Sequence, residues 1–277
     1  MRQAPEWSDS SRISWSAGLK RSLLRTQHEN VSSDTIRGSS YRPFNAQVVG
    51  FSKTFNERQG RIPDLFPTAA HANFGFLVTG VSSHHDFSVI AVDSIPNLHL
   101  LDSGQFFSRY TYEPVDDGEL AIGSTDEPIV DGYRRIDNVS DDALTRYQTA
   151  FGEQVTKDEI FASIYALLHS EQYRTTFAAD LKRQLPRLPL PDSADDFYAF
   201  ERAGRELFEL HIGYEDVTPF TLHEEWSLGA DPAAASALEV VKMRWGGTAR
   251  VKDRTRIVVN EHLTLVGIPG SSGFRVR

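Results

Sequence analysis

The chain has 277 residues and no cysteine, and its 29 Lys and Arg against 38 Asp and Glu give a formal net charge of −9. The lack of cysteine excludes disulfides, thiolate metal ligands and cysteine nucleophiles. The sequence has no run of about 18 apolar residues, so no transmembrane helix is expected. The first residues lack the apolar segment of a secretory signal. With 40% hydrophobic residues, the composition is typical of a globular protein of one or two domains, and we expect it in the cytoplasm.

The charge is unevenly distributed along the chain. Residues 1–60 hold nine Lys and Arg against five acidic residues, and residues 242–277 hold eight against two, whereas residues 61–241 hold 12 against 31. Two basic ends around an acidic middle are typical of a protein that presents one face to a polyanion. The alternative is that the acidic residues only favour solubility and that the tail is a basic hairpin; charge alone does not separate the two.

The first part of the chain reads as a polar leader followed by a short helix at Trp15–Leu24 and a loop at Ser32–Ser40. The motif Tyr41-Arg42-Pro43-Phe44 comes next. Because proline disfavours the helical conformation of the preceding residue, Arg42 is expected to be extended between two aromatic residues. It is either presented to a base edge or a phosphate, or held in an aromatic anchor and paired with a carboxylate; packing favours the anchor. Lys53 and Arg58 follow in a segment of loop composition, which suits contact with a groove.

Alternation and β-branched residues predict that strands dominate as far as residue 123. The segment Ser124–Asp142 is rich in Asp, Gly and Pro and is expected to be a loop. His84, His85 and Asp86 are the nearest approach to a metal cluster, but an exposed turn is favoured because neighbouring turn residues point in different directions. The expected strands are Val48–Phe51, Phe74–Val81, Phe87–Asp93, Gln105–Tyr112 and Glu119–Ile122.

Helical patterns follow the loop, beginning with a modest helix at Asp142–Gly152. Thr156 with Glu159 forms a capping box before a wide apolar stripe. Ser170 is expected to cap a second helix that ends at Pro186, which leaves Arg187 in a stiff, extended exit. Two further features stand out: Ser193 with Asp196 caps another helix, in which Gly204 is expected to let a neighbouring helix approach, and His169 and His211 are expected to be hydrogen-bonded core histidines.

The tail returns to strands at Leu238–Trp245, Arg256–Asn260 and Leu263–Ile268, with a turn at Gly246-Gly247, whereas Thr218–Asp231 is expected to be irregular. Basic residues crowd this tail. A basic β-ribbon or loop can enter the major groove of DNA, so this cluster is the first choice for DNA contact. Its members are Arg244, Arg250, Lys252, Arg254 and Arg256.

No motif of an independent active site is present. The chain has no Asn/Asp-Pro-Pro-aromatic loop of an adenine methyltransferase, no GxxxxGK[ST] phosphate loop and no GxSxG. His223-Glu224-Glu225 lacks the second histidine of a zincin helix. The acidic pairs Asp116-Asp117 and Asp195-Asp196 are explained by turns and helix caps. We therefore expect no catalytic residue and no metal ligand in this chain.

Several blocks resemble the C-terminal specificity region of type ISP restriction–modification enzymes. They are WSAGLK, SSYRPF, IFASIYALLHSEQYR, LPRLP, FERAGRELFELHIGYE, VKMRW and TLVGIP, in this order from about Trp15 to Pro269. Type ISP enzymes join nuclease, helicase-like motor, adenine-N6 methyltransferase and target-recognition domain in one polypeptide. The resemblance implies a target-recognition domain without the nuclease, motor and methyltransferase, so S-adenosylmethionine, ATP and Mg are expected only in those other domains.

The residues and the resemblance together predict an α+β fold. We expect a leader and linking helix over residues 1–40 and a target-recognition domain over 41–277, β-rich at 41–123, helical at 141–216 and a β-hairpin tail, packed back on the sheet, at 238–277. The predicted function is sequence-specific recognition of double-stranded DNA; the alternative is a module that docks on a methyltransferase or helicase-like domain without binding DNA itself. The predicted DNA contacts are Arg42, Lys53, Arg58, Arg187, Arg244, Arg250, Lys252 and Arg254.

Overall fold

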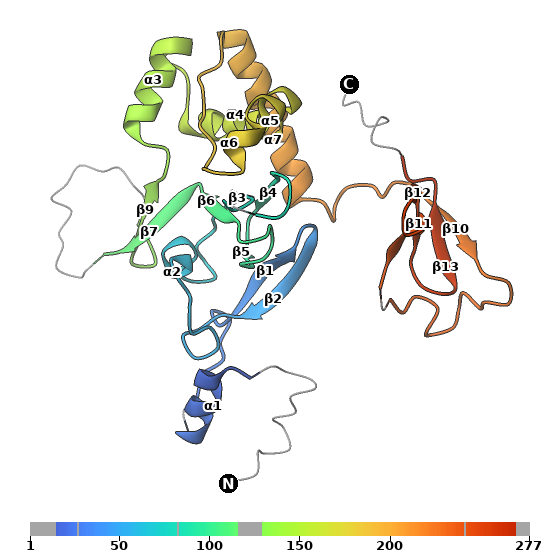
Figure 1. Cartoon of the computed structure of the whole chain (residues 1–277). Coiled ribbons are helices and arrows are strands. Elements are labelled where there is room, and N and C mark those ends of the chain that lie inside the picture. Colours follow the sequence, from blue (N-terminus) through green and yellow to red (C-terminus); the bar gives the residue numbers. More distant parts are fainter. Residues whose placement is uncertain (1–14, 27, 82, 116–128, 241, 270–277) are drawn as a thin grey trace. The chain divides into compact units, whose positions relative to one another are not determined.

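The computed structural model describes residues 15–26, 28–81, 83–115, 129–240 and 242–269. The chain divides into two compact units, Met1–Asp216 and Val217–Arg277, referred to below as unit 1 and unit 2. Unit 1 combines helices with three small sheets, and unit 2 holds a sheet of its own, as Figure 1 shows. The α+β prediction is confirmed.

The helices are α1 (Ala17–Leu24), α2 (Ile62–Leu65), α3 (Asp141–Phe151), α4 (Lys157–His169), α5 (Glu171–Thr176), α6 (Ala178–Leu181) and α7 (Ala194–Ile212). The strands of unit 1 are β1 (Ile36–Arg42), β2 (Asn45–Gly50), β3 (Gly75–Val78), β4 (Val89–Val92), β5 (Ile95–Pro96), β6 (Gln105–Ser108), β7 (Tyr110–Pro114), β8 (Ile129–Val130) and β9 (Tyr133–Asp137). Those of unit 2 are β10 (His223–Trp226), β11 (Arg244–Gly247), β12 (Lys252–Val258) and β13 (Leu263–Val266).

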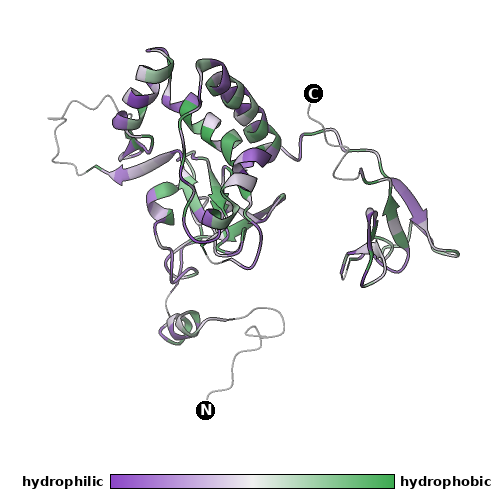
Figure 2. Ribbon diagram, turned by 45° about the horizontal axis from the view of Figure 1, so that its top comes forward, coloured by the Kyte–Doolittle hydropathy of each residue, from purple (hydrophilic) through white to green (hydrophobic). Residues whose placement is uncertain are grey.

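The centre of unit 1 is the antiparallel sheet β4-β3-β6, which is covered on both faces. Phe76 and Val78 of β3 pack against the helices, whereas Leu77, between them, belongs to a second cluster with Ile90 and Leu100 on the other face. Strands buried on both faces read as continuous apolar runs, which is why every residue of β3 and β4 is buried. These strands are hydrophobic in Figure 2.

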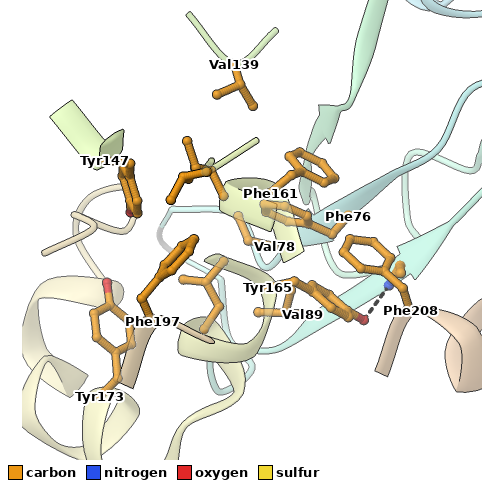
Figure 3. Packing of buried hydrophobic residues seen from close by; sticks show 14 of the residues in the cluster. Phe76, Val78, Val89, Val139, Tyr147, Phe161, Tyr165, Tyr173, Phe197 and Phe208 are labelled. Carbon is orange, nitrogen blue, oxygen red and sulfur yellow. Dashed lines mark hydrogen bonds between the residues drawn. The ribbon is translucent and has the colours of Figure 1, made fainter. Parts of the chain in front are cut away.

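Helices α4 and α7 form the layer over this sheet, and the aromatic core lies between them and β3 (Figure 3). The capping box of Thr156 and Glu159 is present at the start of α4, and Ser193 caps α7 through the amide of Asp196. Gly204 is where the two helices meet, because a Cβ at this position would lie 1.9 Å from the carbonyl oxygen of Ala162. All three predictions are confirmed. The helix expected from Ser170 to Leu185 is instead two short helices, α5 and α6.

Three sequence expectations in unit 1 are wrong. The loop expected at Ser32–Ser40 contains most of β1, because this polar strand pairs with β2. The segment Gln105–Tyr112 forms two strands in different sheets, β6 and β7, rather than one. The loop expected at Ser124–Asp142 contains β8 and β9, which pair with each other and, through β9, with β7. The strand expected at Glu119–Ile122 lies outside the described residues.

Arg109 separates β6 from β7 and holds the joint between sheet and helix. Its side chain is 3% exposed and forms ion pairs with Asp137, at the end of β9, and with Asp158, in the first turn of α4. Burial disfavours the cation, but the hydrogen bonds and charges of the two carboxylates leave the pKa of Arg109 raised. A buried arginine satisfied in this way fixes local geometry more than it adds stability.

Unit 2 is the antiparallel sheet β10-β13-β12-β11. The prediction of an irregular Thr218–Asp231 is wrong at β10, whose sequence His-Glu-Glu-Trp shows no apolar alternation. The strand expected at Leu238–Trp245 begins only at Arg244. Before it, the side chain of Asn260 donates to the carbonyl oxygens of Ala237 and Glu239. Gly246-Gly247 belongs to β11 and is not the turn.

Among the described residues, no helix is both long and apolar enough to cross a membrane.

Candidate nucleic-acid interface

The eight cationic side chains predicted to contact DNA are all exposed. Arg42 lies on the β1–β2 hairpin, Lys53 and Arg58 lie in the segment between β2 and α2, and Arg187 follows α6. The other four belong to unit 2, on or between β11 and β12. The structure therefore brings half of the predicted contacts onto one short hairpin, Arg244, Arg250, Lys252 and Arg254.

Arg42 is positioned by its hairpin and not by a core carboxylate. Its guanidinium lies 4.4 Å from the centre of the Tyr41 ring and donates to the carbonyl oxygens of Tyr41 and His99 at 3.0 and 3.4 Å. Phe44, with a positive φ of 55°, packs edge-on against His211 and Tyr214 near the end of α7. Phe44 is thus the aromatic anchor, and the expected pairing of Arg42 with a carboxylate is absent among the described residues.

Lys53, Arg58 and Arg187 have exposed side chains without a hydrogen-bond or ion-pair partner in the described part of the chain. The backbone at Arg187 is fixed, since its carbonyl oxygen accepts a hydrogen bond of 2.7 Å from the Tyr173 hydroxyl. A fixed backbone with a free cationic side chain suits contact with a phosphate, which needs charge more than exact orientation.

The β11–β12 hairpin concentrates free positive charge in unit 2. Its turn is closed by hydrogen bonds between Thr248 and Val251, and Gly247, the last residue of β11, has a positive φ of 81°. Arg250 lies at this turn, with Lys252 and Arg254 following on β12. Within the described ranges, none of the four cations of the hairpin has an ion-pair or hydrogen-bond partner for its side chain.

The strand register gives the sheet of unit 2 one polar face. Paired residues of neighbouring strands point to the same side of a sheet, and alternation along each strand then sorts the rest. Arg244 pairs with Val258, which pairs with Thr264 and, through it, with Glu225; Arg256 lies two residues before Val258. This face, called the polar face below, carries His223, Glu225, Arg244, Arg256 and Thr264 together with Val258 and Val266.

Arg256 belongs to the basic cluster of the tail but was not among the eight predicted DNA contacts. Its guanidinium pairs with Glu225, and its aliphatic stem lies over Gly246, where a Cβ would be 2.4 Å from its Cγ. No local pattern predicts this pair, because Glu225 and Arg256 are 31 residues apart. Gly246, next to a second glycine, was the available clue, since a glycine inside a strand often marks a close approach.

An irregularity in the pairing of β11 with β12 lies between Asp253 and Ile257 and includes Arg256. Asp253 stabilises it, because the carboxylate accepts from the hydroxyl of Thr255 at 2.6 Å and from its amide at 2.9 Å. The hydroxyl hydrogen bond, followed by the amide, lowers the pKa of Asp253. Such bulges redirect side chains, so Asp253 and Thr255 help to set the direction of Arg256.

The histidines of unit 1 do not form a metal site. His84 and His85 are exposed in a turn, and no group of three or more acidic or histidine side chains in the described chain is arranged to hold a metal ion. His211 contacts the Tyr165 hydroxyl, as expected of a satisfied core histidine, whereas Nε2 of His169 is buried and has no hydrogen-bond partner there. The prediction is therefore confirmed for His211 and wrong for His169.

The acidic pair that the structure describes belongs to a helix cap. Asp196 caps α7, and Asp116-Asp117 lies outside the described residues. A cavity of about 640 Å³ near β6, α3 and α4 is lined mainly by apolar side chains, including Phe107, Tyr147 and Phe161, and no acidic or histidine residue is among its described walls.

The sequence matches one family over nearly its whole length. The family is described as the type ISP C-terminal specificity domain, and the match covers residues 2–271. Among curated proteins, none matches the chain.

Three solved structures of larger proteins are similar to this chain. A cryo-EM structure of a DrdV–DNA complex is 27% identical with a TM-score of 0.74, and the alignment covers 93% of this chain and 24% of that one. A nuclease-deletion mutant of the type ISP enzyme LlaGI, with a DNA substrate mimic, is 25% identical with a TM-score of 0.64, covering 94% and 21%. The ATP-dependent type ISP enzyme LlaBIII bound to DNA, at 22% identity, a TM-score of 0.69 and coverage of 93% and 16%, supports the fold alone.

Proposed function

Because this chain belongs to the type ISP C-terminal specificity domain family, we propose that it recognises a specific sequence in double-stranded DNA for a restriction–modification enzyme. The observation that carries the proposal is the group of four exposed cations on the β11–β12 hairpin of unit 2, whose side chains have no partner among the described residues and one of which, Arg244, belongs to the polar face. When exposed Lys and Arg side chains bind phosphates, the counterions condensed on the DNA are released, and this release drives much of protein–DNA affinity.

Contacts with phosphates and contacts with base edges have different roles. Arg250, Lys252 and Arg254 bind phosphates and set the position of the protein on the duplex, which carries no sequence information by itself. Side chains of the polar face and of the β1–β2 hairpin, where Arg42 is held by Tyr41, read base edges in a groove. Lys53, Arg58 and Arg187 of unit 1 bind further phosphates.

The chain contributes recognition and no chemistry of its own. It spans about a quarter or less of the similar structures, and the parent enzyme would methylate adenine at N6 and cleave DNA with its other domains. Those domains, and not this chain, would bind S-adenosylmethionine, ATP and Mg. Recognition here would place the target adenine for flipping into the methyltransferase pocket, in the cytoplasm where such an enzyme meets DNA.

The proposal is tested by fluorescence anisotropy of the purified chain with duplex DNA across a salt series. Affinity should fall steeply with salt, and the triple variant Arg250→Ala, Lys252→Ala, Arg254→Ala should lower the slope of log K against log salt by about three, because each lost phosphate contact lowers the slope by about 0.9. The matched control replaces three exposed cations of unit 1 by alanine and should leave the slope unchanged. They are Lys182, Arg183 and Arg202.

Equal losses in the two triple variants would mean that net charge alone governs binding, against the proposed contacts. No binding of the wild-type chain at low salt, together with stable binding to a methyltransferase or helicase-like domain, would favour the alternative, a docking module that does not bind DNA itself.

A further inference from the structure

Arg256 differs from every other described arginine and lysine of unit 2 in having an ion-pair partner. Its guanidinium donates through Nη2 to the Glu225 carboxylate, and 38% of its side chain remains exposed. The group is therefore held by the protein and still reachable by a ligand. Its neighbours on the hairpin are reachable but not held.

Three features combine to fix this side chain. Glu225 takes one edge of the guanidinium, the absence of a Cβ at Gly246 leaves room for the stem, and the turn of Asp253 with Thr255 sets the backbone just before it. Each feature comes from a different strand or turn of the same sheet. A guanidinium fixed in advance loses less side-chain entropy when it binds, and it presents its donors in a constant direction.

The pairing with Glu225 suits a base contact better than a phosphate contact. A phosphate attracts any nearby cation, but a carboxylate beside Arg256 cancels much of this attraction. Five N–H groups form the guanidinium fork, and the bond to Glu225 uses one of them. The remaining donors are enough for two parallel hydrogen bonds to adjacent acceptors, and in the major groove the O6 and N7 atoms of guanine offer that pair.

We propose that Arg256 reads a guanine in the recognised sequence and that Glu225 is its positioning residue. This inference rests on the proposed DNA recognition and adds to it a base class and a residue outside the eight predicted contacts. Arg250, Lys252 and Arg254 would then bind phosphates, and Arg256, on the same sheet, would read a base.

The test uses the full chain and a duplex library with a randomised segment, selected for binding at moderate salt and then sequenced. Arg256→Lys keeps the charge but removes the planar fork, so the preference for guanine at one position should fall by about tenfold or more, while the salt slope measured with unselected DNA stays the same. Arg254→Lys is the matched control on the same strand and should leave every base preference unchanged.

Glu225→Gln gives the second readout. Loss of the carboxylate frees the charge of Arg256, so guanine preference should weaken while the salt slope on unselected DNA becomes steeper by up to about one. A residue with a purely structural role would not move the two quantities in opposite directions. Thermal unfolding identifies any variant that fails to fold. Because Glu225 is exposed, Glu225→Gln still tests the proposal if Arg256→Lys does not fold.

The outcomes separate this inference from the proposal beneath it. Sequence-selective binding by the wild type that Arg256→Lys and Glu225→Gln leave intact at every position would overturn the guanine assignment alone. An equal loss of affinity for all sequences in Arg256→Lys, with every base preference kept, would also overturn the guanine assignment. A wild-type chain that selects no sequence would overturn both.

Discussion

Tyr165, His169 and His211 form a polar group inside the otherwise apolar layer of α4 and α7. The Tyr165 hydroxyl accepts a hydrogen bond of 2.8 Å from the amide of Ala91 and contacts His211 (Figure 3 shows the bond to β4). The centre of the His169 ring lies 4.8 Å from the centre of the Tyr165 ring and 5.4 Å from the centre of the His211 ring. Burial lowers the pKa of His169 to about 4, with smaller contributions from His211 and Arg174; burial also lowers the pKa of His211.

These histidines should make unit 1 sensitive to acid. A group whose folded-state pKa lies below its unfolded value of 6.5 favours folding while neutral, and this contribution is lost as the pH falls from about 6.5 towards 4. For His169 the loss should reach about 3 kcal/mol near pH 4. Urea unfolding, followed by the circular dichroism of the helices at several pH values, measures it.

The variant His169→Leu provides the comparison. It removes the titrating group from the same position, so the free energy of unfolding should change less between neutral and acidic pH than in the wild type. An identical pH dependence in the two proteins would show that other groups dominate acid unfolding.

At the scale of elements, the contact of α4 with α7 depends on Gly204. In an exposed helix, replacement of Gly by Ala stabilises by about 1 kcal/mol, but here the new methyl group would meet the carbonyl oxygen of Ala162. Gly204→Ala should therefore destabilise unit 1 by about 2 kcal/mol or more, because overpacking forces the helices apart. Chemical denaturation measures the change.

The neighbouring position supplies the control. Ala203 is exposed on the same helix, and Ala203→Gly should cost about 1 kcal/mol through helix propensity alone. A stabilising effect of Gly204→Ala would show that the helices separate without cost and would contradict the close packing described here.

The elements that were predicted correctly carry their information locally. The capping box at Thr156, the cap at Ser193 and the apolar runs of β3 and β4 are each defined by residues a few positions apart. The missed strands β1, β9 and β10 are polar or charged, and β8 is only two residues long. Strands β9 and β10 also pair with the distant strands β7 and β13, and no local pattern contains those partners.

The candidate site divides in the same way. The basic residues of the β11–β12 hairpin were found from charge and loop composition, which are local. The role of Arg256 depends on Glu225 and Gly246, which the fold brings to it from other strands. The charged segment, including Arg256, is therefore predictable from the sequence, but the contacts that hold Arg256 in place are not.

At the scale of the whole molecule, unit 1 has apolar clusters of its own. The three apolar clusters of unit 1 include no residue beyond Asp216. A chain ending at Asp216 should therefore keep the helical circular dichroism and the thermal transition of unit 1, and its affinity for DNA should fall because the hairpin cations are gone. Melting curves and anisotropy on both chains measure this.

A loss of helical signal in the shortened chain would show that unit 2 supports the fold of unit 1. Undiminished, equally salt-dependent binding by the shortened chain would place the DNA contacts in unit 1 and contradict the role given to the hairpin.

The central sheet has a consequence for synthesis of the protein on the ribosome. Strands β3, β4 and β6 are complete once Ser108 has been made, but the helices that cover Phe76 and Val78 end only at Ile212. At about 5–20 residues per second, the apolar face of these strands waits on the order of 5–20 s for its cover. The nascent chain should therefore depend on ribosome-associated chaperones during that interval, and slower translation would lengthen the exposure.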